Sequence, residues 1–120
     1  MIVAGFGFSS RATTDSLTDA LRLAAQDLTV DACAAPADKT LPLMPVAKAV
    51  GVEVVAVPPD ALKAQQTQTQ SQKSLETRGT GSVAEASALA AAGPGAVLLR
   101  PRVQSADRLA TCALAQGKKP

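Results

Sequence analysis

The chain has 120 residues, enough for one domain of ordinary size but not for two, so we expect residues 1–120 to form a single domain. Its 12 basic and 10 acidic residues leave a net charge of +2, which is too small for a protein whose affinity for nucleic acid rests on neutralising phosphates. The sequence has no histidine, which excludes catalytic dyads and zinc sites built on imidazole.

Alanine makes up 25 of the residues, whereas there are only two phenylalanines and no tryptophan or tyrosine. A core of such small side chains requires helices packed closely on a sheet. No apolar stretch approaches the roughly 20 residues of a membrane span, and the first residues lack the basic segment of a signal peptide. We therefore expect a cytoplasmic protein that has neither nucleic acid nor membrane as a partner.

The first half of the chain alternates strand-like and helix-like segments. Short apolar runs predict three strands, over 2–6, 30–35 and 52–57. Two threonines that can act as N-caps, followed by apolar residues at helical spacing, predict a helix over about 14–27. A shorter helix is expected to end at Gly51, and Asp60 can cap a brief helix over 61–63.

The composition changes over 65–80. Residues 65–72 are glutamine, threonine and serine only, so no apolar side chain offsets the entropy lost when the segment is ordered. We predict a flexible polar surface loop. It is either a lid over a ligand or a lengthened connection without function.

Ser82 and Glu85 fit the S-x-x-E pattern of a capping box and predict the start of an alanine-rich helix that ends at the G-P-G of 93–95. Two final strands are predicted over 96–99 and 109–114. The alternation of strands and helices predicts an α/β fold, a single-domain sandwich whose central, largely parallel or mixed sheet is flanked by helices.

Ligands of such folds bind where strands end and helices begin. Gly5 and Gly7 let a ligand approach the backbone closely, and Ser9 and Arg11 follow them before the first helix. The segment is either an anion-binding edge or only a tight turn. Ser10 occupies the place of the third glycine in a dinucleotide fingerprint, so we reject nucleotide binding.

A second glycine-rich entry to a helix lies at 79–82 and contributes Gly81 and Ser82 as candidates. Glu85 either caps this helix or serves as a general base, for which its surroundings would have to raise its pKa. Lys39 is either a solvated loop residue or the partner of a ligand carboxylate.

Arginines and cysteines complete the candidates. The arginines near the last hairpin are typical of a solvated sheet edge: Arg100, Arg102 and Arg108. Cys33 and Cys112 are isolated in sequence and are interpreted as small buried hydrophobic residues, with a disulfide or a metal pair as the alternative. With no histidine and two cysteines that are distant in sequence, the chain lacks the nitrogen and sulfur ligands of a transition-metal site, so we expect no metal and no cofactor.

Three segments, in chain order, carry a resemblance. They are V-A-G-F-G-F over 3–8, the loop around Lys39 and G-T-G-S-V-A-E-A-S-A-L over 79–89. They resemble the CobE/CbiG C-terminal family of cobalamin biosynthesis, and the resemblance spans nearly the whole chain. Two features depart from the family: Arg11 stands later than the arginine that often follows the second glycine, and T-L-P over 40–42 lacks the usual glutamate.

The resemblance implies a role in building the corrin ring of vitamin B12, with a precorrin or corrin as ligand. The longer relative CbiG opens a cobalt-precorrin lactone and releases acetaldehyde, so an enzymatic version of this chain would be a hydrolase with Glu85 as acid/base and Lys39 as electrostatic stabiliser. The alternative is a non-catalytic carrier, or a partner of other enzymes of the pathway. The implied ligand-binding residues are Gly5, Gly7, Ser9, Arg11, Lys39, Gly81 and Ser82.

Overall fold

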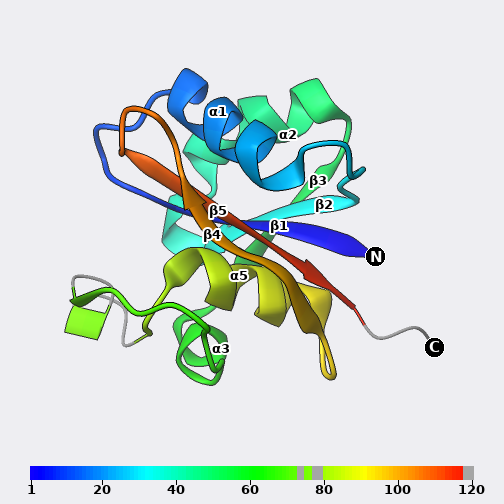
Figure 1. Ribbon diagram of the computed structural model, residues 1–120, viewed down its shortest axis with the longest axis vertical. Coiled ribbons are helices and arrows are strands. Elements are labelled where there is room, and N and C mark those ends of the chain that lie inside the picture. The colour runs from blue at the N-terminus through cyan, green and yellow to red at the C-terminus, as the bar shows by residue number, and fades with distance from the viewer. Residues whose placement is uncertain (73–74, 77–79, 118–120) are drawn as a thin grey trace.

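A five-stranded sheet runs through the centre of the protein, seen here in a computed structural model that describes residues 1–72, 75–76 and 80–117 (Figure 1). The strand order is β3-β2-β1-β5-β4. In chain order the strands are β1 (Ile2–Phe8), β2 (Ala32–Pro36), β3 (Glu53–Val57), β4 (Val97–Gln104) and β5 (Ala110–Gln116).

The sheet is mixed. Strands β1, β2 and β3 are parallel to one another, whereas β5 is antiparallel to β1 and β4 is antiparallel to β5. The three parallel strands therefore end at one edge of the sheet, where β5 begins and β4 ends. This arrangement confirms the predicted α/β fold.

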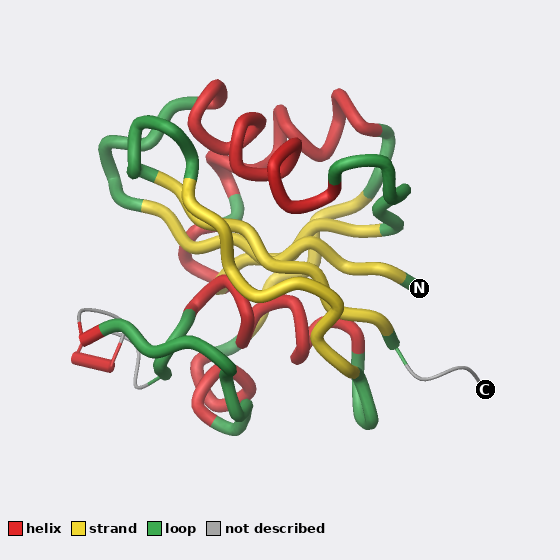
Figure 2. Tube along the Cα trace, in the orientation of Figure 1, coloured by secondary structure: helices red, strands yellow, loops and turns green. Residues whose placement is uncertain are grey.

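Helices cover both faces of the sheet (Figure 2). One face carries α1 (Thr14–Ala25) and α2 (Met44–Val50), and the other carries α3 (Pro59–Lys63) and α5 (Val83–Ala92). Two 3-10 turns, η1 (Ala37–Lys39) and η2 (Leu41–Leu43), connect β2 to α2. No helix in the described part of the chain is long and apolar enough to cross a membrane.

Helix α1 forms as its sequence pattern predicts. The Thr13 side chain accepts a hydrogen bond from the backbone N–H of Ser16, which satisfies one of the free donors at the helix start. The apolar side of the helix is buried against the sheet, and Leu17 is 1% exposed. Phe6 of β1 and Leu114 of β5 lie in the same apolar cluster.

Helix α5 packs differently, because its body is alanine and it crosses directly over β1. A Cβ atom on Gly5 would overlap the carbonyl oxygen of Ala84 and the backbone nitrogen of Ala88. Only glycine therefore allows this approach of helix to strand. The position of α5, and with it that of Val83 in its first turn, therefore depends on Gly5.

Several boundaries differ from the predicted ones. Pro58, not Asp60, occupies the N-cap position of α3, and its side chain makes no capping hydrogen bond. Strand β4 continues through Gln104 because it pairs with β5 along its length. Gly51 and Gly93 end their helices as expected, with φ values of 86° and 97°. Of the second glycine-rich entry, Gly79 lies outside the described residues.

Candidate functional site

A pocket of about 720 Å³ opens at the edge of the sheet where the parallel strands end. One wall is the segment 7–11 that joins β1 to α1, and another is the hairpin between β4 and β5. The rest of the lining is Pro36 at the end of β2, Lys39 at the end of η1, Ser71, and Val83, with which α5 begins. Open α/β sheets hold their ligands at this place, beyond the carboxyl ends of the strands.

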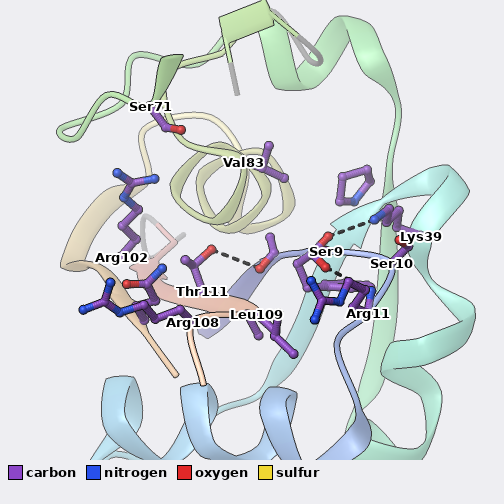
Figure 3. Close-up of a pocket in the computed structure, with 15 residues that line it drawn as sticks. Ser9, Ser10, Arg11, Lys39, Ser71, Val83, Arg102, Arg108, Leu109 and Thr111 are labelled. Atoms are coloured by element: carbon purple, nitrogen blue, oxygen red, sulfur yellow. Dashed lines mark hydrogen bonds between the residues drawn. The ribbon is translucent and has the colours of Figure 1, made fainter. Parts of the chain in front are cut away.

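The pocket is strongly cationic. Arg11, Lys39, Arg102 and Arg108 line it, and none of its described lining residues is acidic. Figure 3 shows Arg102 and Arg108 on one side of the pocket, and Arg11 and Lys39 on the other. The net charge of only +2 for the whole chain conceals this local concentration of positive charge.

Lys39 is held in place at the end of η1. Its Nζ atom donates a hydrogen bond of 2.8 Å to the carbonyl oxygen of Phe8 and lies 5.0 Å from the centre of the Phe8 ring. The side chain is half-buried. The ammonium group therefore stands at a fixed position on the pocket wall before any ligand arrives.

The turn after β1 is also fixed by hydrogen bonds. The backbone N–H of Ser9 donates to the carbonyl of Leu109, and the Ser9 hydroxyl accepts from the N–H of Arg11. The Thr111 hydroxyl donates to the carbonyl of Gly7 at 3.0 Å. These bonds tie the segment 7–11 to β5, so the two walls of the pocket form one unit.

Arg108 stands in a constrained turn. Its φ is 64°, a left-handed conformation that residues with side chains adopt at a cost. The neighbouring Asp107 carboxylate accepts hydrogen bonds from the hydroxyls of Ser16 and Ser105 and from the N–H of Leu109. Hydrogen bonds from Ser105, Ser16 and Leu109 lower the pKa of Asp107. The turn is thereby anchored to α1.

The first turn of α5 faces the pocket through Val83. The Ser82 hydroxyl accepts a hydrogen bond from the N–H of Glu85, as an N-cap does. The positive end of the helix dipole adds to the positive charge of the arginines and the lysine, so this part of the pocket favours an anion.

Glu85 completes only half of the predicted capping box. Its side chain is fully buried, and its two oxygens accept hydrogen bonds from Gln68, Thr69 and Arg102 rather than from the backbone of Ser82. Glu85 does not line the pocket. Its role as acid or base therefore stays a prediction that the geometry of the pocket does not support.

The structure brings together only part of the predicted ligand-binding set. Gly7, Ser9, Arg11 and Lys39 line the pocket. The other predicted ligand-binding residues lie outside its lining: Gly5 beneath α5, Gly81 against Gln70, and Ser82 at the cap of α5.

Arg102, Arg108 and Thr111 also line the pocket but are not among the ligand-binding residues that the sequence predicts. Arg102 lies on the edge strand β4 and Arg108 is exposed in the turn that follows it, as expected for a solvated edge, and both side chains also line the pocket. The available signal was the concentration of three arginines around one turn in a chain with few charges.

Cys33 and Cys112 are free and buried in the apolar cluster beneath α1, which confirms their interpretation as small core residues. Burial raises the pKa of the Cys33 thiol to about 11 and raises that of Cys112 as well. Among the described residues, no group of three or more histidine, cysteine or carboxylate side chains could hold a metal ion.

Comparisons with known proteins agree on one family. The family model for the cobalamin synthesis G C-terminus matches residues 2–115. The solved structure of CobE, a protein from the cobalamin (vitamin B12) biosynthetic pathway, has a TM-score of 0.87 and 26% identity, and the match covers 100% of this chain and 92% of CobE. A search of the curated proteins finds no match.

Two further structures share the fold. The cobalamin biosynthesis protein chiG from Agrobacterium tumefaciens has a TM-score of 0.74 and 33% identity, over 99% of this chain and 100% of that one. A cobalamin biosynthesis protein G homolog from Sulfolobus solfataricus has a TM-score of 0.73 over 98% of this chain and 37% of its own. At 19% identity, the latter match shows the shared fold alone.

Proposed function

Because the chain belongs to the cobalamin synthesis G C-terminus family and is a cobalamin biosynthesis protein, we propose that its pocket binds a precorrin or corrin intermediate through the carboxylates at the ring periphery. The observation that carries the proposal is the gathering of Arg11, Lys39, Arg102 and Arg108 around one pocket with no acidic residue in its described lining.

The chemistry of the ligand matches this charge distribution. Precorrins and corrins carry acetate and propionate groups around a broad, flat ring. Arginine donates two parallel hydrogen bonds to a carboxylate, and such charge-assisted bonds are about twice as strong as neutral ones. Cations on opposite sides of the pocket suit a ligand whose carboxylates point outward in several directions.

The size of the pocket is also suitable. Its volume of about 720 Å³ falls within the range of roughly 300–1,000 Å³ that is typical of small-molecule sites. The apolar Phe8, Val83 and Leu109 stand among the charged residues of the lining and offer contact to the ring itself. A pocket with apolar contacts and a charged periphery fits an amphipathic macrocycle.

Two forms of this function differ in what happens to the bound ligand. A hydrolase would open the ring lactone and release acetaldehyde, whereas a carrier would return the pigment unchanged. The described lining offers no carboxylate that could activate water, and the Glu85 carboxylate is buried behind it. We therefore favour the carrier, with Lys39 as a ligand-binding residue in either form.

The test is a titration of the purified protein with a panel of precorrin and corrin pigments, followed by visible spectra. Two separate variants each remove one positive charge from the pocket. They are Lys39→Ala and Arg108→Asn, in which asparagine tolerates the left-handed backbone of position 108. Each variant should weaken the binding of the retained pigment by about tenfold or more, since hydrogen bonds to charged groups contribute about 1.5–3 kcal/mol.

Lys48→Ala is the matched control, because Lys48 is exposed on α2 and outside the pocket. Binding of no pigment, or equal weakening by all three variants, would contradict the proposal. The spectrum of the released pigment and an assay for acetaldehyde then separate the two forms. Acetaldehyde release by the wild-type protein would establish the hydrolase instead of the carrier.

A further inference from the structure

The buried carboxylate of Glu85 joins two segments that are distant in the sequence. Its Oε1 atom accepts from the backbone N–H groups of Gln68 at 2.6 Å and Thr69 at 2.9 Å. Its Oε2 atom accepts from the Thr69 hydroxyl at 2.8 Å and from the N–H of Arg102 at 3.0 Å. Four donors thus converge on one side chain that is 0% exposed.

The N–H of Arg102 needs this acceptor because β4 is irregular there. Arg100 pairs with Leu114 and Val103 pairs with Cys112, so two residues of β4, at 101 and 102, stand opposite one residue of β5. Such a bulge leaves an extra residue unpaired and redirects side chains. Here the redirected side chain is Arg102, which lines the pocket.

The other segment held by Glu85 also leads to the pocket. Ser71, which lines it, follows Gln68 and Thr69 by only a few residues, and its N–H donates to the carbonyl of Gly81 at 2.6 Å. Arg102 and Ser71 stand on the same side of the pocket (Figure 3). One carboxylate therefore holds the backbone of Arg102 itself and that of residues 68–69, which lead to Ser71.

We infer that Glu85 is a positioning residue, which holds the bulge of β4 and residues 68–69 so that Arg102 faces the ligand, and which does not itself touch the ligand. The inference rests on the proposed function only in treating the pocket as an anion-binding site. The hydrogen bonds of Glu85 to the two segments stand independently of any ligand.

The arrangement requires a carboxylate rather than an amide. In Glu85→Gln, the remaining oxygen can still accept from the two N–H groups of Gln68 and Thr69. The new NH2 group then takes the place of Oε2 and faces the Thr69 hydroxyl and the N–H of Arg102. The Thr69 hydroxyl can reverse its role and accept from that NH2, but the N–H of Arg102 can only donate. The substitution therefore releases Arg102 selectively.

The first experiment needs no ligand. Amide hydrogen exchange measured by NMR should accelerate at Arg102 by about tenfold or more in Glu85→Gln, and much less at Gln68 and Thr69. Ser82→Ala is the matched control, because it removes the N-cap of the same helix and leaves the carboxylate intact. Unchanged exchange at Arg102, or the same acceleration in Ser82→Ala, would overturn the inference.

The second experiment measures binding, with uroporphyrin as the probe because this tetrapyrrole carries acetate and propionate groups. Glu85→Gln should weaken binding several-fold, yet add nothing when Arg102→Ala is already present. Combined with Arg108→Asn, its effect should multiply. A full multiplicative loss with Arg102→Ala would show that Glu85 does not act through Arg102, and would overturn the inference.

The two experiments separate the two claims. If the wild-type protein fails to bind uroporphyrin and every corrinoid pigment, the proposed function fails, while the exchange rate at Arg102 still decides the role of Glu85. Should Glu85→Gln not fold, Thr69→Val replaces it, since this variant removes one donor without adding a polar group. It should accelerate exchange at residues 68–69, which the carboxylate holds, and should leave the N–H of Arg102 protected. Unchanged exchange at residues 68–69 would contradict the inference.

Discussion

On the face of the sheet covered by α1, leucine and phenylalanine side chains fill the space between helix and strands, whereas on the face covered by α5 alanine and glycine bring the backbones into contact. The first kind of packing depends on side-chain volume, and the second depends on the absence of side chains. The second kind of packing bears directly on the pocket, because the first turn of α5 forms part of its wall.

The largest loss of stability is expected on the α1 face. Leu17→Ala should reduce the free energy of unfolding by about 2–5 kcal/mol, because the fully buried side chain leaves a cavity. Ligand affinity should change little, since the helix backbone stays in place. Urea denaturation and the pigment titration measure the two quantities. Leu23→Ala, on the exposed side of the same helix, should cost much less.

Gly5→Ala should destabilise the α5 face by about 1–3 kcal/mol, because the added methyl group overlaps the backbone of α5. Here ligand affinity should fall as well, since α5 must move away from β1. Ala88→Gly should not rescue the variant, because the overlap involves backbone atoms of Ala84 and Ala88. A Gly5→Ala protein with wild-type affinity would show that the pocket is independent of this contact.

A smaller effect concerns the link between α1 and the hairpin of the pocket. The folded-state pKa of Asp107 lies below 3.8, so its carboxylate stabilises the folded protein above about pH 4, and this contribution is lost as the pH falls through the folded pKa. The difference in Tm between wild type and Asp107→Asn should therefore shrink in acid. When Ser105→Ala is already present, Asp107→Asn should lower the Tm by less even at neutral pH, because Ser105→Ala removes one donor to the carboxylate.

The smallest effect is expected in thiol labelling of the buried cysteines, whose labelling rate measures how often the α1 face opens. With a pKa of about 11 and no exposure, the Cys33 thiol should resist labelling by a thiol reagent at pH 8 until the protein unfolds. Leu17→Ala should accelerate labelling more than Gly5→Ala does, since Cys33 lies in the cluster beneath α1. The reverse order would contradict the assignment of the two faces.

Local chemistry determined the secondary structure. The cap at Thr13, the helix ends at Gly51 and Gly93 and the β-branched run of β3 depend on residues close in sequence, so spacing and residue type were enough to predict them. Part of the site was also predictable, because Arg11 and Lys39 follow strands whose carboxyl ends meet at one edge.

Only the tertiary structure decided the rest. The sequence predicts Gly5 as a ligand-binding glycine, but in the fold α5 packs directly on it. The sequence predicts Glu85 as a catalytic or capping carboxylate, but in the fold residues 68–69 and β4 donate hydrogen bonds to it. Arg102 enters the pocket because a bulge changes the register of β4, and register depends on pairing between segments. Periodicity and capping act over a few residues, whereas the contacts that shape this pocket join parts of the chain that meet only after the sheet has formed.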